Sequence, residues 1–395
     1  MNTPHPDVDV VIAGGGIAGL GNAYALATAG YRVRVLERAT EFTEIGAGLQ
    51  LAPNATRVLR DWNLLDHVVD KGVVPRRVVL KDAVDGTELT HLALDDQFLH
   101  RYGAPYVVIH RSDLLGILLA ACERAGVELL PDHTVDSAET VGDRAVLHAG
   151  GQQHTAKVAL AADGLRSALR ARVSNDEPIP SGYVAYRGTL PVTQVSNELA
   201  DHALRDVVVH FGPGCHLVQY PLRSGEMVNT VAVFKSPAFQ RGESQWGAPE
   251  ELDAAFSGTC EQVQRGLTFL WRDRNWPMYD RAPIPSWVDG RIALTGDAAH
   301  PMLQYLAQGA CQALEDAHCL VGEITKLSDA TEPDWPGALR AFQATRTQRT
   351  AQVQSAARVW GETWHVDGFA RALRNTLFRD RDPADYRHID WLYGA

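Results

Sequence analysis

The chain has 395 residues, 45% of them hydrophobic and 22% charged, and its 37 basic and 48 acidic side chains give a net charge of −11. This composition is typical of a globular protein of roughly two to three domains and excludes a disordered, collagen-like or coiled-coil chain. A chain this acidic is a poor candidate for wrapping nucleic acid or lying on anionic lipid, which leaves a local basic pocket for a small anion.

The cysteines and the apolar N-terminal stretch bear on cell compartment. The cysteines are Cys122, Cys215, Cys260, Cys311 and Cys319. They have neither CxxC nor zinc spacing, so we expect free thiols in a reducing compartment and no metal site. Residues 10–30 have the length of a membrane span, but they lack a basic start and contain five glycines between Gly14 and Gly21. We therefore expect a cytoplasmic protein without a membrane span.

The first predicted element is a buried parallel strand over 8–13, because this run is nearly continuous in β-branched residues. The G-x-G-x-x-G turn 14–19 follows, then a helix ending at Gly30 and a second strand over 32–36. Gly14 makes the tight turn, Gly16 lets the backbone approach a pyrophosphate, and Gly19 lets helix and strand pack closely. Glu37 closes the unit and is expected to accept hydrogen bonds from ribose hydroxyls. The unit predicts a dinucleotide site but does not separate FAD from NAD.

Two later motifs each place a carboxylate beside a glycine after an apolar strand. Asp163-Gly164 follows the strand 158–160, and Gly296-Asp297 follows the strand that begins at Ile292 and precedes a helix. Either dipeptide alone is an ordinary turn. Together with the first motif, and in this order, they indicate contacts to the ribityl, ribose and pyrophosphate groups of one dinucleotide.

The sequence between the second and third motifs differs from the flanking sequence in its pattern of short strands and turns. Short β-type runs at 207–211, 217–220 and 228–234 are separated by turn signals at 212–214 and 224–226. Residues from about 335 onward are helical in pattern, and 328–336 resemble a loop.

These patterns and the three separated motifs predict the fold class. We expect an α/β protein with a discontinuous Rossmann-like dinucleotide-binding domain (1–75, 101–182 and 285–334), which the family resemblance given below implies to be an FAD-binding domain. An inserted, mostly antiparallel β-sheet substrate domain is expected over 76–100 and 183–284. A C-terminal helical segment (335–395) is expected to pack simply onto the FAD-binding domain.

The motifs together identify the chain as similar to the single-component, class A flavoprotein aromatic hydroxylases over nearly its whole length. Residues 44–50 resemble the family loop near the flavin ring, 110–114 the segment whose arginine reaches the FAD, and 183–188 the strand that opens the substrate domain. The resemblance implies non-covalent FAD, with NADH or NADPH as co-substrate. It implies FAD contacts from Gly14, Gly16, Gly19, Glu37, Arg38, Gly48, Arg111, Asp163, Gly164, Gly296, Asp297 and Gly309.

Departures from the family pattern point to a branch. Gln304 stands where many members have a proline, and with residues 214–222 it resembles the 3-hydroxybenzoate 6-hydroxylase branch, which is related to salicylate hydroxylases. Cys311 stands where many members have an asparagine, and Leu306-Ala307 where some carry a glycine. The resemblance implies that a flavin C4a-hydroperoxide hydroxylates 3-hydroxybenzoate para to its hydroxyl, giving 2,5-dihydroxybenzoate (gentisate).

Three side chains are the candidates for substrate chemistry. His216 is the candidate base for the phenolic proton, because an imidazole with a pKa of about 6.5 accepts a proton at neutral pH. By position alone it is a surface histidine at a strand end; the family resemblance shifts the interpretation to catalysis. Gln304 is expected to hydrogen-bond the substrate hydroxyl, and Tyr220 to help hold the substrate. His300 is expected to be structural.

Other functions stay open. One is a salicylate-type hydroxylase, or a hydroxylase of another phenolic acid, including a carrier- or CoA-bound one. An FAD-dependent dehydrogenase without oxygen chemistry is less favoured, because the sequence has no second G-x-G-x-x-G for NAD. A non-enzymatic dinucleotide sensor is the last. The expected partners are a small aromatic acid and O₂, with a homodimer as the alternative to a monomer.

Overall fold

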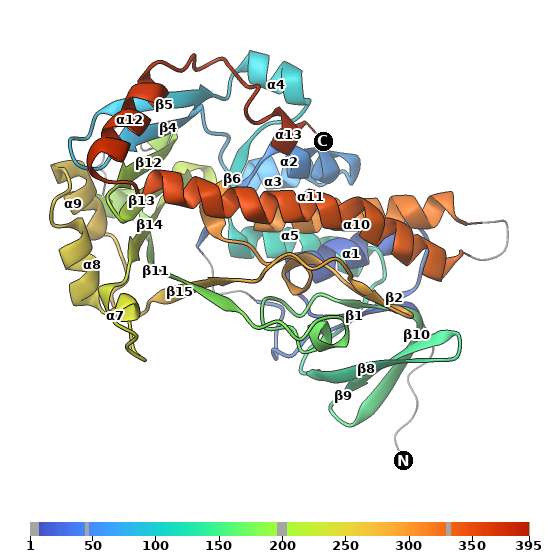
Figure 1. The fold of residues 1–395 in the computed structure, drawn as a ribbon. Helices are drawn as coiled ribbons and strands as arrows, with labels where there is room; N and C mark the ends of the chain where they lie inside the picture. The colour runs from blue at the N-terminus through green and yellow to red at the C-terminus, as the bar shows by residue number, and fades with distance from the viewer. Residues whose placement is uncertain (1–7, 44–46, 196–203, 329–332, 395) are drawn as a thin grey trace.

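The first large sheet carries the glycine-rich turn. The computed structural model describes residues 8–43, 47–195, 204–328 and 333–394 (Figure 1). The sheet has eight strands, with the order β16-β17-β10-β1-β2-β7 and a β8–β9 hairpin that joins it through β10. Its strands are β1 (Val8–Ala13), β2 (Val33–Leu36), β7 (Glu128–Leu130), β8 (Val135–Val141), β9 (Arg144–Ala149), β10 (Gln152–Ala161), β16 (Val288–Asp289) and β17 (Ile292–Leu294). β1 pairs in parallel with both β2 and β10, so the predicted strand–turn–helix–strand crossover is confirmed.

Buried helices cover this sheet because its central strands are apolar on both faces. In β1, Val10, Val11 and Ile12 are fully buried. The flanking helices are α1 (Ile17–Thr28), α5 (Arg111–Arg124) and α10 (Gly309–Lys326), and α1 packs against both α5 and α10. The strands of the sheet come from three separate parts of the chain. The fold is therefore α/β with a discontinuous Rossmann-like unit, as predicted.

The second large sheet has seven strands in the order β15-β11-β14-β13-β12-β4-β5. They are β4 (Arg77–Asp82), β5 (Glu88–Ala93), β11 (Ile179–Pro191), β12 (Val207–Gly212), β13 (Cys215–Leu222), β14 (Met227–Lys235) and β15 (Trp276–Asp280). All neighbours are antiparallel except β4 and β12. The three predicted strands and both predicted turns are confirmed. Helices α7 (Pro237–Gln240), α8 (Pro249–Phe256) and α9 (Glu261–Leu267) lie along one side of this sheet (Figure 1).

Smaller elements connect the two sheets. β3 (Gly48–Leu51) and β6 (Val107–His110) form a two-stranded sheet. The other short helices are α2 (Pro53–Asp61), α3 (Leu65–Lys71), α4 (Asp96–Tyr102) and α6 (Val192–Val195). Single 3-10 turns occur at Leu169–Arg172, Arg223–Gly225, Gly296–Ala298 and Gln304–Leu306. No described helix is both long enough and apolar enough to cross a membrane.

The C-terminal helices are α11 (Trp335–Trp364), α12 (Gly368–Arg379) and α13 (Asp390–Tyr393). α11 starts within the predicted 328–336 loop, of which 329–332 lie outside the described residues. Part of this segment packs as expected, since α11 lies along α10. The expectation that it packs only there was wrong. Trp364 packs against Phe211 of β12 with ring centres 4.6 Å apart, and α12 packs on β5 (Figure 1). The end of α11 buries Trp364 in this way, and α12 buries Arg374 and Asn375, so the segment also covers the second sheet.

Candidate functional site

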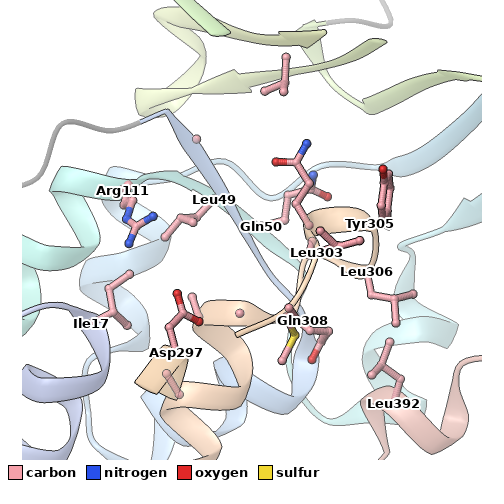
Figure 2. A pocket seen from close by; sticks show the side chains of 18 of the residues that line it. Ile17, Leu49, Gln50, Arg111, Asp297, Leu303, Tyr305, Leu306, Gln308 and Leu392 are labelled. Atoms are coloured by element: carbon pink, nitrogen blue, oxygen red, sulfur yellow. The ribbon is translucent and has the colours of Figure 1, made fainter. Parts of the chain in front are cut away.

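A cavity of about 1670 Å³ is lined by residues of both large sheets, of α10 and of the C-terminal segment. All of the predicted site residues line it except Gly19 and Gly296. Figure 2 shows Arg111 and Ile17 on one side of the pocket and Tyr305 and Leu306 on the other, with Asp297 and Gln308 between them. Of the predicted flavin loop, residues 44–46 lie outside the described residues, while Gly48, Leu49 and Gln50 line the cavity.

The three motif glycines have different physical reasons to be glycine. Gly14 has a φ of +104°, and a Cβ there would lie 2.4 Å from the Ala162 carbonyl oxygen. A Cβ on Gly19 would lie 1.9 Å from the Gly14 oxygen, so this glycine serves close packing, as predicted. A Cβ on Gly16 meets nothing within 4 Å, because it points into open space where α1 begins. No side chain caps α1, which leaves its first N–H groups available to a phosphate.

Two acids near this turn differ in how fully their carboxylates are hydrogen-bonded. The Glu37 carboxylate accepts hydrogen bonds from the backbone N–H of Gly15 (2.6 Å) and of Ala39 (2.9 Å), so it braces the turn while facing the cavity. Asp163 accepts one bond from Leu169 N–H (3.3 Å), and its Oδ1 is buried without a partner among the described residues. A buried acceptor without a donor is costly, and a ligand hydroxyl at the cavity wall would supply that donor.

A second helix N-terminus faces the cavity. α10 begins at Gly309, next to Gln308, and no side chain caps it. Just before it, Ala307 has a φ of +53°, a left-handed conformation that favours glycine and costs an alanine roughly 1–2 kcal/mol. The chain therefore accepts backbone strain where the turn meets α10.

Buried ion pairs hold the Gly296-Asp297 turn in place. Asp316 on α10 is fully buried and accepts hydrogen bonds from Gly296 N–H (2.9 Å), His300 Nε2 (2.7 Å) and Arg346 Nε (2.8 Å). Burial by itself raises the pKa of Asp316, but His300 and Arg346 outweigh it and hold that pKa well below its usual range. His300 is buried and does not line the cavity, so its predicted structural role agrees with its position.

The predicted base lies at the other end of the cavity. His216 is 1% exposed on β13, and its Nδ1 lies 2.8 Å from Nε2 of His365, the residue that follows α11. Trp364 and Tyr305 pack around the ring, with centres 4.9 and 5.6 Å away. Burial, and then His365, lowers the pKa of His216 well below 6.5. The histidine is therefore neutral at neutral pH and able to accept a proton, and the surface interpretation is wrong.

Gln304 meets an arginine that sequence reasoning passed over. Arg187 on β11 lines the cavity and donates from Nη2 to Gln304 Oε1 at 3.4 Å. Its guanidinium also lies 5.6 Å from the centre of the Trp276 ring. No carboxylate of the described residues pairs with Arg187, and its Nε is buried without a partner. Desolvation lowers the pKa of Arg187, which marks a cation that an anion would stabilise.

Tyr220 on β13 lines the cavity beside Gly48. It is 3% exposed, and a Cβ on Gly48 would lie 2.4 Å from its ring, so this glycine lets β3 approach β13. Burial raises the pKa of Tyr220 above its ordinary value, so the phenol stays protonated and able to donate.

The sequence carried little signal for Arg187 and His365. Arg187 stands inside the strand 183–188 that resembles the opening strand of the substrate domain, but no local pattern assigns it a role. His365 is 149 positions from His216, and no spacing rule links them.

Comparisons with known proteins agree with this geometry. The family model "FAD binding domain" matches residues 7–357. The 3-hydroxybenzoate 6-hydroxylase of Polaromonas naphthalenivorans (strain CJ2) is 37% identical, covering 100% of this chain and 98% of the relative. The 3-amino-4-hydroxybenzoate 2-monooxygenase of Streptomyces cremeus is also 37% identical, over 98% and 95%. In fold, the chain is similar to Klebsiella pneumoniae HpxO complexed with FAD and uric acid (TM-score 0.83, 24% identity, 98% and 96% covered). A salicylate hydroxylase substrate complex gives a TM-score of 0.80 at 24% identity, with 98% and 96% covered.

The chain therefore belongs to this family of FAD-binding proteins, and it is a flavin-dependent aromatic monooxygenase. The predicted resemblance to 3-hydroxybenzoate 6-hydroxylases is confirmed. A dehydrogenase without oxygen chemistry and a non-enzymatic sensor are set aside.

Proposed function

We propose that the protein hydroxylates 3-hydroxybenzoate para to its hydroxyl, giving 2,5-dihydroxybenzoate, with FAD, NAD(P)H and O₂. The observation that carries this proposal is the substrate end of the cavity. There a buried neutral histidine lines the same cavity as an amide that bonds to an arginine, and this arginine has no carboxylate partner among the described residues. That set suits a phenol that also carries an acid group.

The chain's own groups suit FAD. The pyrophosphate would lie at the start of α1 beside Gly16, and hydroxyls of the dinucleotide would meet Glu37 and Asp163. The N–H groups at the start of α10 would face the ring system. FAD supplies the transfer of electrons from the nicotinamide to O₂ and the delivery of one oxygen atom to the ring.

His216 and Gln304 would activate the substrate hydroxyl. A phenolate is richer in electrons than a phenol, so removing the proton speeds attack by an electrophilic oxygen. Neutral His216 takes this proton at Nε2, the ring nitrogen opposite the one that contacts His365. Because Gln304 turns its Oε1 to Arg187, its NH₂ group is left to donate to the phenolate oxygen.

Arg187 would take the substrate carboxylate. Its guanidinium keeps several N–H donors without an anionic partner, and arginine binds carboxylates through paired, charge-assisted hydrogen bonds. A hydroxyl held by His216 and Gln304, with the acid held by Arg187, orients the ring at two points. Ring electronics favour the ortho and para carbons alike, so these two anchors would select the para carbon.

The Streptomyces relative supports one alternative, because it is as similar to this chain as the 3-hydroxybenzoate enzyme and its name gives 3-amino-4-hydroxybenzoate as substrate. A salicylate-type hydroxylase stays as the other alternative.

One panel tests the three substrates. The holoenzyme is incubated with NADH and, separately, 3-hydroxybenzoate, salicylate and 3-amino-4-hydroxybenzoate, and the products are identified by chromatography. We expect coupled turnover of 3-hydroxybenzoate to 2,5-dihydroxybenzoate. Formation of 3,4-dihydroxybenzoate, or turnover of another acid with 3-hydroxybenzoate inert, would refute the proposal.

We also propose the domain division given above, non-covalent binding of FAD, and a homodimer as the alternative to a monomer. We further propose a cytoplasmic location, which the five free thiols support.

A further inference from the structure

Helix α12 is built with its polar face inward. Arg371 donates two hydrogen bonds to the buried carboxylate of Asp82 on β4 (2.8 and 2.7 Å), and Asn375 Nδ2 donates to the same carboxylate at 2.5 Å. Arg374 is also buried and donates to the backbone carbonyl of Trp364 at 2.7 Å. Spacings of three and four residues place these donors on one side of the helix. The helix therefore cannot turn over without leaving a buried carboxylate unpaired, which is costly.

The opposite side of α12 carries an exposed apolar stripe. Its residues are Phe369, Leu373 and Leu377, which are 85%, 51% and 62% exposed and follow one another at intervals of four residues. The helix lies at the outside of the molecule, beside β5 (Figure 1). A surface helix ordinarily buries its apolar side and exposes its polar side, and α12 does the reverse. An exposed apolar patch of this kind marks a surface that binds a partner.

The stripe borders an opening of the cavity. Trp360 of α11 packs on Phe378 of α12 with ring centres 5.9 Å apart, and both residues line the cavity. Their neighbours in sequence, Val359 and Leu377, line the cavity as well, although they are 63% and 62% exposed. The cavity therefore reaches the surface between α11 and α12. A partner seated on the stripe would cover this opening.

The size of the apolar patch suits a second copy of this chain. The exposed parts of Val359 and of the three stripe residues amount to roughly 500 Å² of apolar surface, which is large for a patch on a monomer. A stable dimer buries about 800 Å² on each copy, with an apolar core and a polar rim. The patch is large enough to be that core. Exposed polar residues beside it on α12, such as Thr376 and Arg379, would belong to the rim.

The charges around the stripe do not suit a lipid surface. A helix that lies on a membrane carries lysines and arginines that face the lipid headgroups. In α12, Arg371 and Arg374 are turned toward the protein instead. The exposed charges at the two ends of the helix have both signs and belong to Asp367, Arg379 and Asp380. The net charge of −11 also opposes binding to anionic lipid. A second copy of the chain is therefore the better partner.

We propose that two copies of this chain pair through their α12 helices, packed antiparallel about a two-fold axis at Leu373. In a two-fold interface the same patch of both copies meets itself. Centred on Leu373, the pairing places Phe369 against Leu377 of the partner subunit, and the two Leu373 side chains against each other. Each copy then covers the opening between α11 and α12 of the other. This inference holds whichever aromatic acid the cavity binds.

The oligomeric state of the holoenzyme tests the pairing. Mass is measured by light scattering after gel filtration at micromolar concentration, and we expect wild type to be a dimer. Leu373→Glu brings two carboxylates together on the axis, so the dissociation constant should rise by roughly 30-fold or more, with flavin content unchanged. Val141→Glu, at a similarly exposed apolar residue on β8, is the matched control and should stay dimeric. A monomeric wild type, or a Leu373→Glu dimer as tight as wild type, would overturn the inference.

Disulfide cross-linking tests the position of the axis. The variants are made in a Cys260→Ser/Cys319→Ser background, which removes the two native thiols that are not buried. Under mild oxidation Leu373→Cys should link two copies, because only a residue on the axis meets its own counterpart. Phe369→Cys should form a link only when it is mixed with Leu377→Cys. No link at Leu373→Cys, or a link in Phe369→Cys alone, would overturn the inference.

Vesicles of phosphatidylglycerol test the other occupant. We expect wild-type holoenzyme to stay in solution when such vesicles are sedimented. Sedimentation of wild type with the vesicles, lost in Leu373→Glu and kept in Val141→Glu, would make a lipid surface the occupant and overturn the pairing.

Discussion

The two ends of the cavity are built on different principles. At the dinucleotide end, the groups offered to a ligand are mainly backbone N–H groups at the starts of α1 and α10. At the substrate end, they are side chains of Arg187, His216 and Gln304, supplied by β11, β13 and a 3-10 turn. A backbone site depends on a few glycines close together in sequence, whereas a side-chain site depends on tertiary packing. The first end tolerates few substitutions, and the second is where specificity can change.

The two ends also differ in charge. The dinucleotide end places Glu37, Asp163 and Asp297 along the wall, which suits the hydroxyls of a ligand whose phosphates lie at the helix ends. The substrate end has neutral histidines and the cation Arg187. An anionic aromatic acid is therefore expected to bind at the second end and not at the first.

The largest effect should come from Gly16→Leu. The new side chain would enter the space of the pyrophosphate without striking the protein, because a Cβ there meets nothing within 4 Å. Loss of two charge-assisted hydrogen bonds would weaken FAD binding by about 4 kcal/mol, or roughly 1000-fold. Flavin content per protein and the thermal midpoint with and without added FAD measure this. Gly116→Leu, at an exposed site on α5 that is equally open, is the matched control and should keep its flavin. Full flavin occupancy in Gly16→Leu would contradict the assignment.

His216→Ala should leave FAD in place and lower the rate of hydroxylation by roughly 100-fold or more, the usual scale for a positioned base. The reason is that His216 lies at the substrate end, outside the dinucleotide motifs. Rapid-mixing kinetics of the oxidative half-reaction measure the step. An unchanged hydroxylation rate would remove His216 from the chemistry.

Arg187→Met should lower kcat/KM for the acid 3-hydroxybenzoate much more than for its neutral amide. The loss of a charge-assisted contact is expected to reduce kcat/KM for 3-hydroxybenzoate by about 2 kcal/mol, or roughly 30-fold. Turnover of 3-hydroxybenzamide, which lacks the negative charge, should change by less than about 3-fold in the same assay. Equal losses for both compounds would show that Arg187 acts by orienting Gln304 and not by binding the carboxylate.

The last prediction concerns how the free energy of unfolding depends on pH. The folded pKa values of His216 and His365 are depressed, so the unfolded chain binds protons there that the folded chain does not. Their contribution to stability is complete above a pKa of about 6.5 and is lost as pH falls, by about 2 kcal/mol per histidine between pH 7 and 5. Urea unfolding at both pH values measures this. The His216→Gln/His365→Gln double variant should lose less stability on acidification than wild type, and an equal loss would contradict the burial of neutral rings.

The sequence predicted the dinucleotide end of the cavity better than the substrate end. The turn 14–19 and the strand 8–13 are local patterns with a backbone cause, and both were confirmed in place. The hairpin turns of the second sheet were predicted from the Gly-Pro-Gly signal at 212–214 and the Ser-Gly-Glu signal at 224–226 between β-type runs. Gln304 and His216 came from family resemblance, which fixes position but not surroundings. Arg187 and His365 were missed, because a lone arginine in a strand and a histidine after a long helix have no local signature. Their meaning comes from contacts over large sequence separations.

Helix α11 has a consequence for the spacing of the two ends. In the first half of the helix Arg346 donates to Asp316, which holds the turn on the dinucleotide side, and just after the helix ends His365 contacts the His216 ring. An α-helix rises 1.5 Å per residue, so these two contacts are about 28 Å apart along one straight element. Inserting a single residue between them would turn one contact by about 100° relative to the other. The number of residues between Arg346 and His365 therefore fixes both the distance and the angle between the two contacts. Natural variants should preserve that number more strictly than the identity of the residues between them.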